Sequence, residues 1–92
     1  MIIVSDQVRY FLKYPLRCFF GKEDNYYVIQ SEMLGIIGTG LTEDDAENSF
    51  AVEFDYMYQR LNSLKATSLT NHNLLIKKII TQIVEKVEQG AY

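Results

Sequence analysis

The residues in this chain that could carry out chemistry are few and isolated. It holds one histidine, His72, and one cysteine, Cys18. His72 falls at the start of a predicted helix, where a capping or surface role is typical, and Cys18 alternates with the apolar residues of a predicted strand. No second His or Cys stands at ligand spacing, which excludes a zinc site within one chain. We therefore predict a protein that is not an enzyme, with no catalytic residue, no metal and no cofactor.

Two other patterns resemble sites only superficially. The glycine-spaced run at 35–40 lacks the helix-opening glycine of a dinucleotide-binding loop, and acidic residues follow it. Its glycines are better explained as the boundaries of a strand. The adjacent acids Asp44 and Asp45 stand at a predicted helix start, where capping and the helix dipole account for them.

The overall composition favours one small cytoplasmic domain. The chain has 92 residues, of which 48% are hydrophobic, so a packed core is expected. No apolar run approaches the roughly 20 residues that span a membrane, and residues 1–11 lack the pattern of a signal peptide. A single cysteine cannot form an internal disulfide.

The spacing of apolar residues predicts an antiparallel sheet covered by a helix. Apolar side chains occupy the even positions from Val8 to Phe20, which indicates a strand with one buried face, broken near Tyr14–Pro15. Residues 21–25 have the composition of a turn. Further strands are predicted at 2–4, 26–30 and 36–39.

The helix that follows residue 41 has the clearest start in the chain. Thr42 is placed to cap it, and Asp45 completes an acidic variant of the capping box. Its apolar stripe predicts a helix packed on the sheet, and it consists of Ala46, Phe50, Phe54, Met57 and Leu61. Val52 and Tyr56 fall on the opposite side, which suggests a contact surface.

A second helix is predicted after the linker at 62–68, capped by Thr70 or Asn71 and ended by Gly90. This helix could pack on the other face of the sheet or against its copy in a second subunit. We favour a homodimer, because a small domain gains most from a shared core. The residues expected to form that interface are Ile76, Ile79, Ile80, Ile83 and Val87.

Charge is distributed unevenly along the chain. Residues 42–59 carry six acidic side chains and no basic one. Such a surface suits a basic protein partner, although a simply solvated helix face would look the same. The residues expected to contact a partner are Glu43, Asp44, Glu47, Val52, Asp55 and Tyr56.

A weaker pattern points to nucleic acid. Arg9, Lys13 and Arg17 alternate with Phe11 and Phe19 at odd positions, so one unbroken strand would place them on one face. Basic residues among aromatics are typical of a nucleic-acid stacking surface. Basic side chains on the solvent face of a strand are equally common, and the net charge of −3 opposes tight phosphate binding.

Three segments together resemble the HicB family of antitoxins. They are Lys22-Glu23-Asp24-Asn25-Tyr26-Tyr27-Val28, Ser31-Glu32-Met33-Leu34-Gly35 and Gly38-Thr39-Gly40-Leu41-Thr42-Glu43-Asp44-Asp45-Ala46. The resemblance covers about half of the chain. It implies a degenerate ribonuclease-H-like α+β fold that binds a small basic RNA-cleaving toxin of the HicA type and covers the toxin's catalytic histidine.

We therefore predict an α+β protein with a small antiparallel sheet of three to four strands, ordered β-β-β-α, one covering helix and a C-terminal helix. Residues 1–64 would form the HicB-like domain, and residues 65–92 the linker and oligomerisation helix. The chain after the linker is too short for the DNA-binding segment that many family members carry. The alternatives are an orphan homo-oligomeric interaction or regulatory module without a toxin, or a weak nucleic-acid binder.

Overall fold

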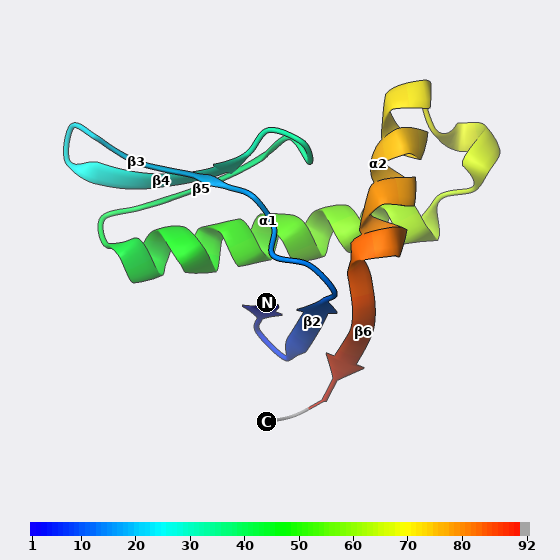
Figure 1. The fold of residues 1–92 in the computed structure, drawn as a ribbon, viewed down its shortest axis with the longest axis horizontal. Coiled ribbons are helices and arrows are strands. Elements are labelled where there is room, and N and C mark those ends of the chain that lie inside the picture. The colour runs from blue at the N-terminus through cyan, green and yellow to red at the C-terminus, as the bar shows by residue number, and fades with distance from the viewer. Residues whose placement is uncertain (91–92) are drawn as a thin grey trace.

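The structure, a computed structural model, describes residues 1–90 and has an α+β fold with two sheets. Both sheets contact the long helix α1, and the short helix α2 stands across the C-terminal end of α1 (Figure 1). The elements are β1 (Ile2–Ser5), β2 (Val8–Leu12), β3 (Phe19–Glu23), β4 (Tyr26–Ser31), β5 (Ile36–Gly40), α1 (Glu43–Ser63), the 3-10 turn η1 (Ala66–Ser68), α2 (Asn71–Ile83) and β6 (Val84–Gln89).

Each sheet has three strands, and all of its pairs are antiparallel. The first sheet has the order β1-β2-β6, so the first and last strands of the described residues lie in one sheet. The second has the order β3-β4-β5. The predicted run β-β-β-α is therefore present as β3, β4, β5 and α1, but the strands of the protein form two sheets and not one.

The long period-2 run divides between the two sheets. Its first part is β2, which ends at Leu12, and its last residues begin β3 at Phe19. The predicted break is confirmed, because Pro15 lies between the strands and has no amide hydrogen for a ladder. Leu16 is buried beyond the break, so the connection stays anchored to the core while the chain changes sheets.

Helix α1 begins as the sequence predicts. The Thr42 hydroxyl accepts a hydrogen bond of 3.1 Å from the backbone amide of Asp45. The predicted stripe faces inward, with Met57 partly buried and the other members buried. Because sheets contact it on two sides, the buried side of α1 is wider than one stripe and includes Ala51.

Glycine lets the second sheet approach α1 very closely. A Cβ atom on Gly38 would lie 2.3 Å from the backbone nitrogen of Phe50, and one on Gly40 would lie 2.6 Å from the backbone nitrogen of Ala46. Such distances leave no space for a side chain. The glycines that mark this strand in the sequence therefore set the distance between sheet and helix.

The predicted C-terminal helix is wrong in its second half. Thr70 caps α2, accepting a 3.1 Å hydrogen bond from the Asn73 amide, but α2 ends at Ile83. Val87 lies in β6, where it pairs with Tyr10 of β2. Its helical spacing continues the stripe of α2, so local periodicity misassigns it. Pairing with the free edge of β2 outweighs that local preference.

Candidate interaction surface

The side of α1 that faces away from both sheets carries exposed apolar residues. Val52 and Tyr56 are 55% and 63% exposed and stand one helical turn apart. Asp45 and Ser49 continue this line toward the start of the helix, where it meets β5, because the Ser49 hydroxyl accepts a hydrogen bond from the Thr39 amide. The predicted exposure of the Val52–Tyr56 pair is confirmed. Asp45, which the sequence explains as a capping residue, is exposed in this line beside Gly40 of β5.

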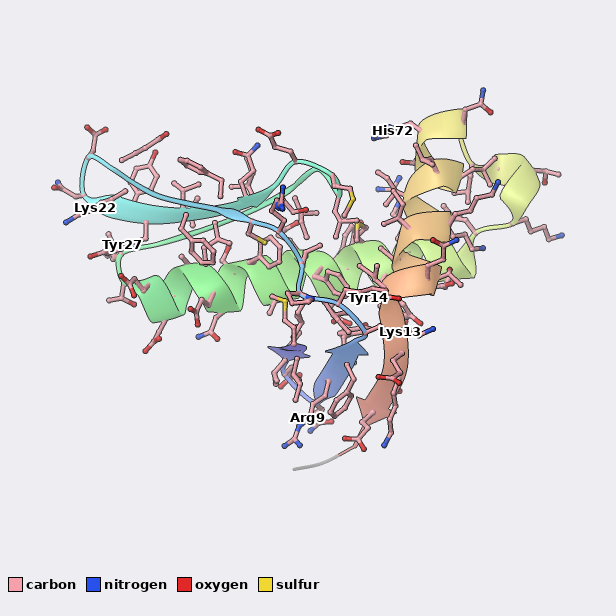
Figure 2. All side chains as sticks on the ribbon, in the orientation of Figure 1. Arg9, Lys13, Tyr14, Lys22, Tyr27 and His72 are labelled. Carbon is pink, nitrogen blue, oxygen red and sulfur yellow. The ribbon has the colours of Figure 1, made fainter. Side chains whose placement is uncertain are left out.

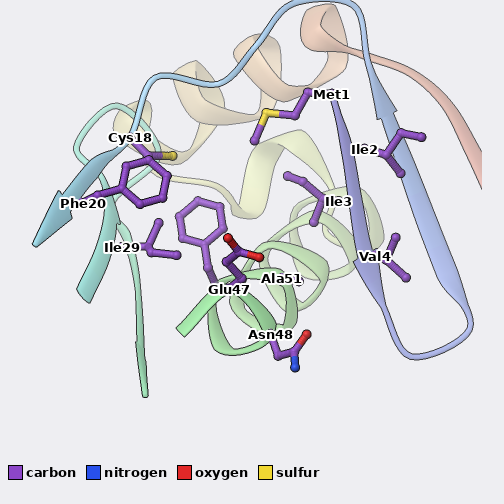
Figure 3. A pocket seen from close by; sticks show the side chains of 11 residues that line it. Met1, Ile2, Ile3, Val4, Cys18, Phe20, Ile29, Glu47, Asn48 and Ala51 are labelled. Atoms are coloured by element: carbon purple, nitrogen blue, oxygen red, sulfur yellow. The ribbon is translucent and has the colours of Figure 1, made fainter. Parts of the chain in front are cut away.

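The predicted acidic surface is divided. Asp44 is exposed at the start of α1. Glu47 instead lines a cleft of about 300 Å³ whose walls come from β1 and β3, with α1 as its floor (Figure 3). Glu43 and Glu47 both line a second hollow, of about 340 Å³, beside β3 and β4. The acids therefore face three different environments, because consecutive turns of α1 pass between two sheets.

Asp55 has a structural role within the chain. Its Oδ1 atom accepts a hydrogen bond from the hydroxyl of Tyr10, and Nε2 of Gln59 donates to the same hydroxyl at 3.2 Å. Tyr10 has no exposed surface, and its ring packs edge-on against Phe54 and Tyr58. Burial, and then the bond to the Asp55 carboxylate, hold the pKa of Tyr10 well above its ordinary value. Asp55 thus ties α1 to β2.

The predicted oligomerisation residues differ in exposure. Ile76 and Ile80 are 6% and 0% exposed in the single chain, so its own core already covers them. Ile79, Ile83 and Val87 are partly buried against the same core. Leu75, outside the predicted set, is 57% exposed on α2. A second subunit could therefore contact the partly buried members of this stripe, but not Ile76 and Ile80 at its centre.

The predicted basic row does not form one continuous strand face. Arg9 lies in β2, while Lys13 and Arg17 lie in the connection between β2 and β3. Figure 2 shows Arg9 and Lys13 well separated from each other. Glu88 of β6 stands directly opposite Arg9 and forms a 2.9 Å ion pair with Lys86. This sheet therefore offers mixed charge.

The sequence pattern missed the exposed aromatics of β3. Phe20 belongs to the even positions predicted to be buried, yet it is 68% exposed. Its side of β3 faces α1, but β3 is the outermost strand and the helix does not reach beneath it. Phe19, on the other face, is 63% exposed and its ring covers Gly21. Ile37 of β5 is 48% exposed.

The remaining candidate groups stay apart. His72 is exposed in the first turn of α2 (Figure 2). Cys18 is half-buried, and burial raises the pKa of its thiol. Within residues 1–90, no three His, Cys, Asp or Glu side chains gather as a metal site. Neither described helix combines the length and apolarity needed to cross a membrane.

Comparison with known proteins gives no relative on which to draw. No protein-family model matches the chain, and neither the curated proteins nor the solved structures include a significant match. Any functional assignment therefore depends on the residues and surfaces of this chain.

Proposed function

We propose that this protein is a HicB-like antitoxin, which binds and inhibits a small basic RNA-cleaving toxin and has no catalysis of its own. The observation that carries the proposal is the exposed pair Val52 and Tyr56 on the outward side of α1, a helix whose first turn carries Glu43, Asp44 and Asp45. An exposed aromatic anchor on a helix with an acidic first turn is a suitable contact for a basic protein.

The arrangement of elements supports the same proposal. The segments that resemble the HicB family fall, in that order, on the β3–β4 hairpin, the connection between β4 and β5, and the end of β5 with the start of α1. Glycine packing sets the separation between this sheet and the helix, so the outward side of α1 has a rigid support. A rigid support lowers the entropy cost of binding a partner.

The geometry narrows the set of residues expected to touch the toxin. Asp44, Val52 and Tyr56 remain candidates because they are exposed outside the two hollows that Glu43 and Glu47 line, and the exposed Asp45 joins them. Asp55 is excluded as a primary contact, since Tyr10 and the core hold it. Inhibition would follow from covering the catalytic histidine of the toxin, as the family resemblance implies.

The proposal is tested by capture from the native host with a tagged chain at moderate salt, followed by mass spectrometry. We expect recovery of a small basic protein in near-stoichiometric amount. That protein, purified alone, should cleave RNA and should stop cleaving when this chain is added. Recovery of a partner without RNase activity, or of no partner, would reject the antitoxin function.

Matched variants locate the surface. Val52→Ala combined with Tyr56→Ala should weaken binding on the order of a hundredfold, as expected for the loss of a central anchor. Leu75→Ala is the control, because Leu75 is equally exposed but lies on α2. Equal loss from both variants would show that the outward side of α1 is not the contact.

A second candidate function is a homo-oligomeric interaction module without a toxin. The exposure of Phe19 and Phe20 on the two faces of the edge strand β3 favours it, since exposed large apolar side chains at a sheet edge often mark an interface. The two functions are compatible, because this strand and the outward side of α1 are different surfaces.

A further inference from the structure

The free strand edges of the two sheets differ in how they are protected. On β5, the amide of Thr39 donates a 3.2 Å hydrogen bond to the hydroxyl of Ser49 on α1, so the helix covers that edge. β6 carries charged residues, including the ion pair of Lys86 and Glu88, which discourage strand pairing. β1 has four residues and packs against α1. β3 has no comparable cover.

The backbone of β3 offers hydrogen-bonding groups at its open edge. The hairpin closes with Glu23 opposite Tyr26 across a two-residue turn, so Glu23, Gly21 and Phe19 bond to β4. The amide and carbonyl groups of Phe20 and Lys22 therefore point the other way. No strand of the described chain, residues 1–90, pairs with that edge.

We propose that β3 pairs with β3 of a second copy, in antiparallel register about Gly21, to form a homodimer with a continuous six-stranded sheet. This interface is distinct from the outward side of α1, so the inference does not depend on the antitoxin function. A closed two-fold contact of this kind also removes an edge that would otherwise invite aggregation.

The sequence of β3 is self-complementary in this register. Phe20 of each copy stands opposite Lys22 of the other, and these pairs exchange the backbone hydrogen bonds that each copy leaves open. No like charges face each other directly. Gly21 meets its copy at the two-fold axis, beneath the Phe19 ring that already covers it. The two Phe19 rings then come within reach of each other across the axis.

The face toward α1 has space for the incoming side chain. The hollow of about 340 Å³ is lined by Lys22, Tyr27, Glu43 and Glu47, and Phe20 stands at its edge. In the proposed register, the second copy's Phe20 ring lies beside Lys22 and enters this hollow. Lys22 already lies 5.3 Å from the centre of the Tyr27 ring, so its ammonium group is positioned among aromatic faces.

Sedimentation equilibrium of the full chain across micromolar concentrations tests the proposal. We expect a mass of about twice 10.7 kDa. Phe20→Lys puts like charges opposite each other twice per interface and should weaken the dimer on the order of tenfold or more. The double variant Phe20→Lys with Lys22→Glu restores opposite charges and should recover the dimer. Ile37→Lys, on the far strand of the same sheet, is the control and should leave it unchanged.

Amide hydrogen exchange identifies the edge directly. In the dimer, the amides of Phe20 and Lys22 should exchange more slowly than in the Phe20→Lys monomer, while that of Gly21 is already paired with β4 in both. Because Phe20 is 68% exposed, the variant should retain its circular dichroism spectrum. A monomeric wild type, or a dimer that Phe20→Lys leaves intact and Leu75→Lys dissociates, would overturn the proposal.

Discussion

The two sheets are attached to α1 by different means. In the first, the buried ring and hydroxyl of Tyr10 reach the helix and bond to Asp55 and Gln59. In the second, the backbone of β5 approaches the helix directly at Gly38 and Gly40. The first attachment depends on side-chain chemistry, and the second depends on the absence of side chains.

The sheets also differ in what they leave exposed. The outer strand β6 of the first sheet is charged, whereas the outer strand β3 of the second presents Phe19 and Phe20. We infer that the first sheet mainly stabilises the monomer. The second sheet packs closely on α1 through β5 and offers the free edge of β3 for association.

The largest effect is expected where the second sheet meets the helix. Gly38→Val would place atoms inside backbone of α1, since even a Cβ lies 2.3 Å from the Phe50 nitrogen. The helix or the strand must shift, and we expect a loss of about 3 kcal/mol or more in the free energy of unfolding. Urea denaturation measures it. Thr39→Ala, exposed on the opposite face, should change stability by no more than about 0.5 kcal/mol.

A smaller effect is expected where the first sheet meets the helix. Tyr10→Phe keeps the ring packing but leaves the half-buried Asp55 carboxylate without its tyrosine donor. We expect a loss of about 1–3 kcal/mol in the free energy of unfolding at pH 7. An unchanged denaturation midpoint would show that water replaces the hydroxyl and that the attachment is ring packing alone.

The same variant should change the response to alkaline pH. The pKa of Tyr10 is raised in the folded state, so the folded chain holds this proton while the unfolded chain loses it near pH 10. The stabilisation is therefore complete below about pH 10 and decreases as the pH rises further. Tyr10→Phe should lose stability less steeply than wild type between about pH 9.5 and 11. Parallel slopes would contradict the raised pKa.

The smallest effect is expected on the charged outer strand. The side chains of Lys86 and Glu88 are 62% and 34% exposed, so water competes with their ion pair. Lys86→Ala should change the free energy of unfolding by no more than about 0.5 kcal/mol. Its effect should instead appear as lower solubility, because the strand loses part of its charge. A large loss of stability would contradict this and show that the side chains of β6 contribute strongly to the stability of the fold.

The sequence predicts the helices and strands better than it predicts which strands pair with each other. The cap at Thr42 and the stripe of α1 are local patterns of hydrogen bonding and helical spacing, and both are confirmed. The division of the strands into two sheets depends on contacts distant along the chain, which periodicity does not encode. Val87 shows the limit most clearly, since its spacing fits α2 while its pairing is with Tyr10.

The candidate surface could be predicted in part. Exposure of Val52 and Tyr56 follows from their place opposite the buried stripe. The role of Asp55 could not be predicted, because Tyr10 is 45 residues away in sequence. Phe20 obeys the alternation of its strand, and its exposure arises only because β3 ends the sheet.

The most direct test of the proposed function is titration of an RNA-cleavage reaction. The small basic protein recovered with this chain would be held at fixed concentration while wild type or the Val52→Ala, Tyr56→Ala variant is added. We predict that wild type stops cleavage at about one equivalent per toxin, and that the variant requires far more. Undiminished cleavage at excess wild-type protein would contradict the antitoxin account.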